Sequence, residues 1–402
     1  MDKATTGYRQ LLQFPDVRAL LLAACLSRLA GRMLLLAIVL YVLDRHRSPV
    51  LAGWVTFALV APGLVVSPLA GAWLDRMGPA RAIVLDMAAS ALLILALAAA
   101  GLADMLPVPL LFVLVTLFSL TSPLSSAGVR VLLPRLVPPA ALDRANALDT
   151  TSYAAIDVVG PAIAGLLFAT IGAAPSLFTI AALYALAALS LVTVAQHLSP
   201  ASSHARKPVV QEAIDGVVHV LSHASLRGLA ISYALYMVSL GILYVAVPAI
   251  VVRQAGAEGM TIGGLWALMG MAAAAGALAI GHMRTDSRER LVMAVGMSAS
   301  AVAIWPVTAS FGLMGLAMGL ACIGFFSGPI DVGLLSLRQR RTDPAKLGRV
   351  LAVSIALNSS GFPLGSALGG FLIVRSTELT FLVAAAASML AAFSAWVLIP
   401  RR

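Results

Sequence analysis

The sequence is poor in charged residues, which make up 11% of its 402 positions, against roughly 25% in soluble globular proteins. Hydrophobic residues make up 60%, and the mean hydropathy is +0.97. A soluble domain of this size cannot hide that much apolar surface, because it still needs a polar exterior. A disordered chain is excluded for the opposite reason. The composition therefore predicts an integral membrane protein.

Cysteines and enzyme motifs are also scarce. The two cysteines, Cys25 and Cys322, lie in apolar blocks, so we expect no disulfide framework. There is no His-Glu-x-x-His motif, no phosphate-binding loop with lysine and no Gly-x-Ser-x-Gly motif. The histidines show no metal-ligand spacing. We expect no enzyme activity, no metal and no cofactor, and an ion gradient, best a proton gradient, as the energy source.

What the sequence contains instead is a series of long apolar blocks. A helical span of a bilayer needs about 20 apolar residues, whereas strands of a membrane barrel show short segments of alternating polarity. We predict an all-α polytopic membrane protein with twelve transmembrane helices. The blocks lie near 19–43, 51–74, 82–102, 107–133, 151–171, 174–195, 229–252, 261–283, 291–308, 311–336, 349–373 and 379–400.

The basic residues predict the orientation. Of the 27 Lys and Arg residues, twenty fall on one side of the predicted membrane and four, Arg45, Arg47, Arg253 and Arg375, on the other. The richer side is cytoplasmic by the positive-inside rule, so we expect both termini in the cytoplasm. The net charge of +10 then needs no nucleic acid. The expected partners are the lipid bilayer and a small-molecule substrate, and we expect a monomer.

The two halves of the chain resemble each other. Gly160-x4-Gly165 recurs 205 residues later as Gly365-x4-Gly370. A repeat of half the length of a polytopic protein is typical of transporters whose halves move around a shared site. We predict three parts: an N-terminal six-helix half at 1–195, a cytoplasmic linker with an amphipathic helix at 196–228, and a C-terminal six-helix half at 229–402.

One cytoplasmic loop suggests a family. Gly71-x3-Asp75-Arg76-x-Gly78-x2-Arg81 resembles the signature loop of the major facilitator superfamily. The glycines permit close helix approach and a turn, and Asp75 can pair with a neighbouring helix terminus and an arginine. The resemblance implies a cytoplasmic gate that breaks when the protein opens inward. The alternative is an ordinary charged turn.

Two further resemblances narrow the subgroup. Gly160-Pro161-Ala-Ile-Ala-Gly165 resembles the fifth-span motif of proton-coupled antiporters, where small residues let spans five and eight pack closely. Long stretches, among them Pro363 to Gly370, resemble drug:proton antiporters of the macrolide/tetracycline-efflux and siderophore-exporter type. Asp157-Val-Val departs from the antiporter pattern, which usually has more glycines before Gly160.

Five ionisable residues lie well inside the predicted spans: Arg28, Arg32, Arg130, Asp157 and Asp331. Such residues are costly in a membrane and suggest function. By the resemblance, spans one, four, seven and ten line a central cavity, so the three arginines and Asp331 are candidates to face it. Counting residues along the helices suggests that an arginine at the level of Arg28 bridges to Asp157 or Asp331.

Asp157 and Asp331 are the candidate proton carriers, because an apolar cavity favours a protonated carboxyl group. The alternative is a pair of structural Asp–Arg contacts that never titrate. Asp86 and Asp149 lie near cytoplasmic ends, and we interpret them as helix caps or loop partners.

Other cavity candidates are Tyr233, Met237 and Tyr244, which form one stripe of span seven, and Asn358, a polar residue in span eleven. The stripe suits either ligand contact or helix packing. Relatives of this subgroup often carry Gly-Asp in span one, whereas this chain has Gly31-Arg32. The arginines favour an anionic or zwitterionic substrate, unless they only neutralise Asp157 and Asp331.

These observations predict a secondary transporter of the cytoplasmic membrane that exports an amphiphilic small molecule, of multidrug type, in exchange for protons. An alternative substrate is an endogenous anionic amphiphile, such as a siderophore or a lysolipid. An alternative class is a receptor or scaffold with the same fold. A receptor would need a sizeable soluble domain to pass on a signal, and the sequence shows only short tails.

Overall fold

The computed structural model describes residues 11, 13–138, 141–197, 214, 217–218, 220–255, 259–281, 288–308, 312–342 and 347–400. Every element in these ranges is a helix. The first group comprises α2 (Pro15–His46), α3 (Pro49–Met77), α4 (Pro79–Leu102), α5 (Val108–Thr121), α6 (Pro123–Leu136), α7 (Leu142–Ile171) and α8 (Ala173–His197). The second comprises α10 (Ala224–Ala255), α11 (Gly259–Gly281), α12 (Glu289–Ala303), α13 (Trp305–Thr308), α14 (Gly312–Arg340), α15 (Leu347–Ser359), α16 (Gly361–Ile373) and α17 (Thr377–Leu398).

The predicted twelve spans are recovered in two groups of six. Ten helical stretches of the described chain are long and apolar enough to cross a membrane. One of them, Val108–Leu136, contains α5 and α6, which are separated at Ser122 because α6 starts with a proline. The other two spans are each divided, into α12 with α13 and α15 with α16. The fold class predicted from the sequence is confirmed.

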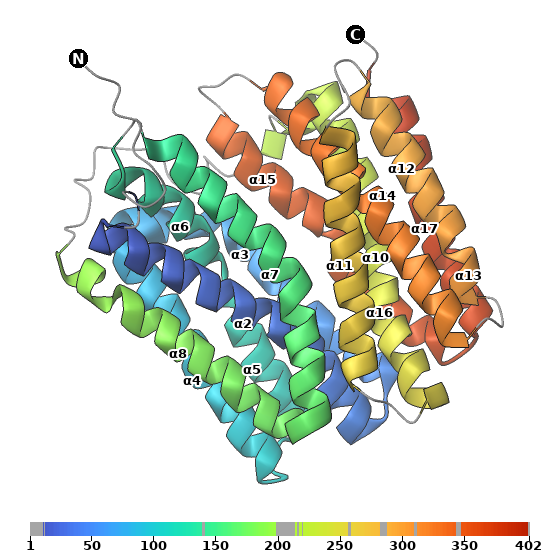
Figure 1. The fold of residues 1–402 in the computed structure, drawn as a ribbon, viewed down its shortest axis with the longest axis horizontal. Helices are drawn as coiled ribbons and strands as arrows, with labels where there is room; N and C mark the ends of the chain where they lie inside the picture. Colours follow the sequence, from blue (N-terminus) through green and yellow to red (C-terminus); the bar gives the residue numbers. More distant parts are fainter. Residues whose placement is uncertain are drawn as a thin grey trace.

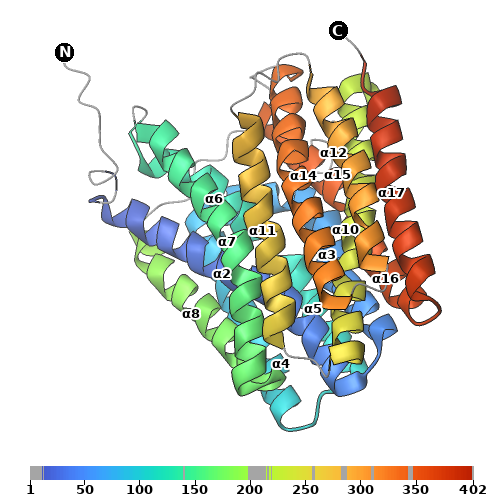
Figure 2. The same ribbon diagram turned by 45° about the vertical axis from the view of Figure 1, so that its right-hand side comes forward.

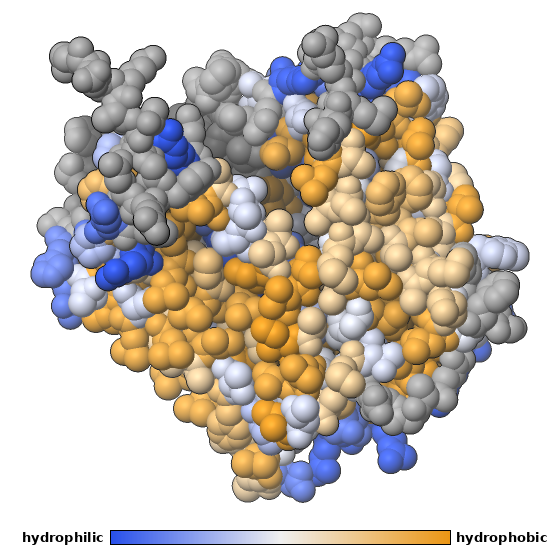
Figure 3. Space-filling view, viewed as in Figure 1, coloured by the Kyte–Doolittle hydropathy of each residue, from blue (hydrophilic) through white to orange (hydrophobic). Residues whose placement is uncertain are grey.

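The two groups of helices meet at one end of the molecule and separate at the other (Figures 1 and 2). Both chain termini lie at the separated end, here called the terminal end. The opposite end, here called the closed end, holds the α2–α3 connection and the last turns of α10 and α16. Space-filling shows a broad apolar band with hydrophilic residues towards both ends, as a membrane protein requires (Figure 3).

The buried core explains this shape. At the closed end one continuous core joins both groups, with Leu36 of α2, Val245 of α10 and Ile262 of α11 among its fully buried members. At the terminal end each group has its own core: one around Leu20 and Ile83 in the first group, the other around Met293 and Ile330 in the second. The halves can therefore separate at the terminal end without exposing either core.

Glycines make the contacts between the groups unusually close. A Cβ atom at Gly165 of α7 would collide with the carbonyl oxygen of Gly259 on α11. A Cβ atom at Gly263 of α11 would lie 2.7 Å from the Pro161 oxygen of α7. On the other side of the molecule, a Cβ at Gly370 of α16 would collide with the Pro49 oxygen of α3. The helix backbones touch at both crossings because no side chain separates them.

The crossing of α7 and α11 generates the first prediction. Gly263→Ala should overpack the crossing and lower the stability of the protein by about 1–3 kcal/mol. Gly264→Ala places its new methyl group in open space, so it should leave the stability unchanged or raise it by up to about 1 kcal/mol. Thermal unfolding of the purified protein in detergent measures both. A Gly263→Ala protein at least as stable as Gly264→Ala would show that the crossing is loosely packed.

Candidate functional site: a charged cavity between the halves

A cavity opens between the two halves towards the terminal end. It has a volume of about 360 Å³ and is lined by α3, α6, the Tyr153 ring of α7 and residues 353, 355 and 356 of α15. Arg130 of α6 is among its lining residues and its side chain is exposed. Figure 3 shows the molecule hollowed between the halves at this end. The prediction that Arg130 faces a cavity is consistent with this placement.

The central charged contact is an ion pair between α2 and α7. Arg32 Nε lies 2.6 Å from Asp157 Oδ1, with side chains 42% and 43% exposed. Gly160, one turn beyond Asp157, permits the approach: a Cβ there would lie 2.7 Å from the Cβ of Arg32. Two oppositely charged groups with this exposure are partly solvated and can exchange partners.

The second contact corrects the register expected from the sequence. Arg28 does not reach Asp157 or Asp331; its Nη1 lies 2.7 Å from Asp149 Oδ1, with side chains 12% and 16% exposed. The same nitrogen donates to the Ser152 hydroxyl at 3.2 Å, and the guanidinium stacks 4.3 Å from the centre of the Tyr153 ring. Asp149 is thus an interior ion-pair partner and not the cap or loop contact that the sequence suggested.

Asp331 lies on the opposite half of the molecule. The Tyr233 hydroxyl of α10 donates to Asp331 Oδ1 of α14 at 2.6 Å. Asp331 is exposed. The two candidate proton carriers thus come from opposite halves, Asp157 paired with an arginine and Asp331 hydrogen-bonded to a tyrosine.

A buried arginine that sequence reasoning missed lies beside Asn358. Arg338 of α14 is 3% exposed, and its Nη2 donates to the Asn358 amide oxygen at 2.5 Å when the amide nitrogen donates to the Ser354 carbonyl at 3.1 Å. Arg338 ends a predicted span, where it was counted with the cytoplasmic charges. Asn358, of unknown role in the sequence, holds this guanidinium.

The stripe on span seven divides between two environments. Tyr244 is buried at the closed end, with its ring 4.6 Å from that of Trp266 and 5.5 Å from that of Phe362. Tyr233 and Met237 are half-buried and pack against the core of the second group. Of the two predicted roles, the structure favours helix packing for Tyr244.

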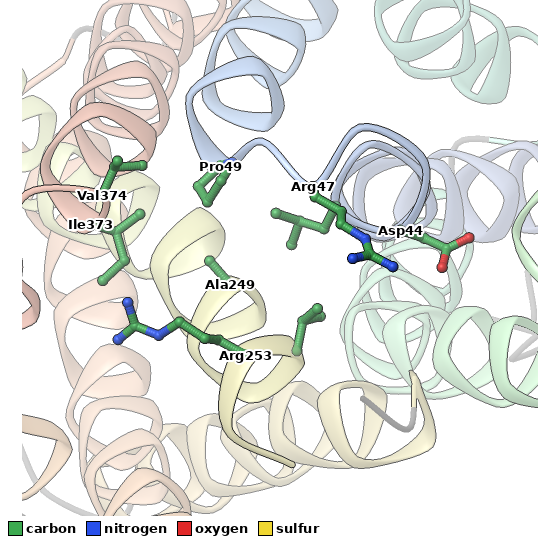
Figure 4. Close-up of a pocket in the computed structure, with 9 residues that line it drawn as sticks. Asp44, Arg47, Pro49, Ala249, Arg253, Ile373 and Val374 are labelled. Carbon is green, nitrogen blue, oxygen red and sulfur yellow. The ribbon is translucent and has the colours of Figure 1, made fainter. Parts of the chain in front are cut away.

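The closed end carries a separate pocket of about 630 Å³ between the two groups. Figure 4 shows Asp44 and Arg47 from the α2–α3 side and Arg253 from α10 on its wall, with Pro49, Ile373 and Val374. The Arg253 guanidinium donates to Thr377 Oγ1 at 3.2 Å. The common core separates this pocket from the cavity at the terminal end.

The predicted gate loop connects α3 and α4. Gly78, at φ +83°, ends α3 and precedes α4, which is a backbone conformation that glycine adopts without strain. Arg76 is exposed, and Arg81 Nε donates to the Ala195 carbonyl of α8 at 3.4 Å. The Asp75 side chain and the surroundings of Gly71 lie outside what the structure describes, so the gate remains a prediction. Most of the predicted linker at 196–228 also lies outside the described residues.

Asp86, which the sequence suggested to be a helix cap or loop partner, is a further interior acid. It lies about two turns inside α4, which begins at Pro79, and is 2% exposed. Its carboxylate accepts hydrogen bonds from the backbone N–H and the hydroxyl of Ser125 on α6. This contact at the start of α6 agrees with the predicted role of Asp86 as a helix cap, whereas the burial of Asp86 inside α4 was not predicted. The signal in the sequence for the buried contact of Asp86 is the break between α5 and α6, which brings Ser125 to this carboxylate.

Comparison with known proteins identifies the family. The sequence model of the Major Facilitator Superfamily matches residues 20–284 and 229–402. The chain belongs to this superfamily, whose members are transporters and not enzymes.

Several relatives are named exporters. The chain is 49% identical over 390 residues to an uncharacterised MFS-type transporter, y4rN, of Sinorhizobium fredii, covering 96% of each chain. It is 28% identical over 366 residues to the multidrug efflux pump Tap of Mycolicibacterium fortuitum, covering 87% of this chain and 88% of Tap. It is 30% identical over 260 residues to the enterobactin exporter EntS of Shigella boydii, and the match covers 61% of this chain and 59% of EntS.

Solved structures confirm the fold. The nucleoside transporter NupG superposes with a TM-score of 0.74 at 13% identity, covering 96% of this chain and 99% of NupG. A peptide transporter POT in complex with sulfate superposes with a TM-score of 0.76 at 13% identity, covering 99% of this chain and 96% of that transporter. These transporters share the fold of this chain.

The two ion pairs should differ in their contribution to stability. Asp149→Asn leaves Arg28 largely buried without its counter-ion and should cost about 3 kcal/mol or more. Asp157→Asn leaves the half-exposed Arg32 unpaired and should cost about 1 kcal/mol or less. Thermal unfolding of both variants in detergent tests this, with Arg28→Gln/Asp149→Asn expected to recover part of the loss. Equal losses at the two sites would contradict the environments described above.

Proposed function

We propose that this protein is a secondary transporter that exports an amphiphilic small molecule in exchange for protons. The supporting observation is the Arg32–Asp157 pair, because the fold itself does not require it. Gly160 meets Arg32 on α2, whereas its repeat partner Gly365 meets Val238 on α10. The position that corresponds to Asp157 in the repeat is Phe362. The second half builds the same helix crossing without charge, which favours a transport role for the pair.

Alternating access follows from the arrangement of the cores. We propose that residues 1–195 rock against residues 229–402, so that the glycine crossings at the closed end separate when the protein opens outwards. The positive-inside rule places the terminal end in the cytoplasm of the inner membrane, so the cavity at Arg130 faces the cytoplasm and the pocket at Arg253 faces outwards. The core around Tyr244 and Trp266 is then the barrier that must open for release.

Export of a drug-like molecule is supported by the resemblance to Tap over most of both chains. A second candidate is an anionic amphiphile, for which the similarity to an enterobactin exporter gives precedent. The observation in favour is Arg130, which lines the cavity. Among the described residues, Arg130 has no carboxylate within ion-pair distance, so an anionic group could bind there.

Asp157→Asn should abolish transport driven by a pH gradient while the protein stays folded, because the amide cannot bind and release a proton. The measurement is proton release from the purified protein on adding cationic, zwitterionic and anionic amphiphiles, together with uptake into proteoliposomes. Asp104→Asn is the matched control, since Asp104 forms an exposed pair with Arg45 at the closed end. Asp331→Asn tests the other candidate carrier.

The outcome separates the substrate classes. Proton release on adding only one class of amphiphile, and the loss of this release in Asp157→Asn, would support antiport and identify that class as the substrate class. Binding without proton release from the wild-type protein would show that the acids are structural and that transport is not proton-driven. Normal pH-driven transport by Asp157→Asn would remove Asp157 from the mechanism.

The gate loop gives a further prediction. Asp75→Asn should slow turnover strongly, by about tenfold or more if the lost contact is worth about 1.4 kcal/mol in the rate-limiting change. Substrate affinity should stay near the wild-type value, because the loop lies at the membrane surface. Turnover in proteoliposomes and binding in detergent measure the two effects. An unchanged turnover rate would exclude Asp75 from gating.

A further inference from the structure

A small chamber lies inside the first half, beside the main cavity, and here is called the side chamber. It has a volume of about 220 Å³ and is lined by residues of α2, α4, α6, α7 and α8 together with Ser122. Asp86 and Ser90 of α4 form one wall, and Arg28 of α2 lines it as well. A chamber of this size with polar walls has room for several water molecules.

The side chamber adjoins the main cavity. Ser122, Ser126 and Tyr153 line both of them. These shared residues carry two hydroxyl groups and one phenol, all of which can hydrogen-bond to water. Asp86, although only 2% exposed, therefore lines a chamber that shares polar side chains with the main cavity.

The bonding of Asp86 leaves one oxygen available. Oδ2 accepts from the backbone N–H of Ser125 at 3.2 Å and from its hydroxyl. Oδ1 has a long contact of 3.5 Å with the Ser90 hydroxyl. Within the described chain no lysine or arginine nitrogen lies within ion-pair distance of Asp86.

The remaining groups around Asp86 are few. The charged and titratable side chains on the described walls of the side chamber are Arg28 from α2, Tyr153 from α7 and Tyr184 from α8. The α6 wall contributes Ser125, Ser126 and Val129. Arg28 is already paired with Asp149, so its charge is largely balanced. An interior carboxylate without its own counter-ion is costly in a membrane protein, and proton binding removes that cost.

We propose that Asp86 is a proton-binding site of the transport cycle, supplied with protons through the side chamber. A proton passes from water in the chamber to Oδ1, where the carboxylate lone pair forms the new O–H bond, and it returns to water by the reverse step. Oδ2 keeps its bonds to Ser125 throughout. The role in the cycle rests on the proposed proton-coupled transport, whereas proton binding by Asp86 does not.

Asp86 also links proton binding to helix position. The Ser125 N–H belongs to the first turn of α6, where backbone N–H groups have no acceptor in their own helix. An ionised carboxylate binds such a helix start more strongly than a neutral acid does. Protonation therefore loosens the contact between α4 and the start of α6, the helix that carries Arg130 into the main cavity.

The test is infrared difference spectroscopy of the full chain in lipid nanodiscs, in sodium-free buffer, across a step in pH. A protonated carboxyl group gives a carbonyl band distinct from the bands of carboxylates. We expect Asp86→Asn to lose one such band, Asp86→Glu to show it at a shifted frequency, and Asp104→Asn to keep it. In addition, substrate-induced proton release should fall by one proton per molecule in Asp86→Asn.

The two claims fail separately. If Asp86→Asn and Asp86→Glu are folded and keep the complete wild-type set of carboxyl bands, Asp86 does not bind a proton and the proposal is overturned, whatever the transport assay shows. If the band depends on Asp86 but wild-type proteoliposomes show no pH-driven transport, proton binding by Asp86 stands and the proposed transport function is wrong. If transport is proton-coupled and Asp86→Asn releases as many protons as wild type, Asp86 has no part in the cycle.

Discussion

The two halves of this protein are held together where helix backbones touch through glycine, and the rest of the architecture depends on these crossings. Gly165 meets Gly259 and Gly263 on one side, and Gly370 meets Pro49 on the other. Both crossings lie towards the closed end, so the terminal end carries no core that joins the halves. A change in the angle between the halves therefore opens or closes the cavity while each half keeps its own packing. The crossings themselves suit this purpose, because no side chains interdigitate between the touching backbones.

The sequence repeat encodes these crossings but not the charges. Gly165 and Gly370, which are equivalent in the repeat, form the two crossings between the halves. Gly160 and Gly365, also equivalent, bring α7 against α2 and α16 against α10 within each half. The first half adds Arg32 and Asp157 at its crossing, where the second half has Val238 and Phe362. Charge was thus placed on one side of a scaffold that is otherwise nearly symmetric, at a cost in desolvation that a purely structural contact does not need.

The spans could be predicted from the sequence because each apolar block is long enough to cross a bilayer and because the repeat fixes their number. The ion-pair partners could not. The heights of residues along their helices suggested that Arg28 lies opposite Asp157. However, α2 and α7 cross at Gly160, and this crossing determines which residues meet. As a result, Arg32 pairs with Asp157 and Arg28 pairs with Asp149. The burial of Asp86 could not be predicted for a related reason. Its partner Ser125 follows the break at Ser122, and a hydropathy profile treats the block from Val108 to Leu136 as one helix.

The break between α5 and α6 connects the chemistry of the first half with its shape. Pro123 starts α6, and a proline at this position has no N–H to bond, so the next free donors of that turn, including the Ser125 N–H, point out of the helix end. A buried carboxylate on α4 accepts that donor, and the same turn places Ser122 and Ser126 between the side chamber and the main cavity. An unbroken helix would bond the Ser125 N–H to the Thr121 carbonyl and leave Asp86 without this backbone donor. The interruption of the fourth span is therefore what makes an interior acid tolerable, and it also brings that acid to the edge of the cavity.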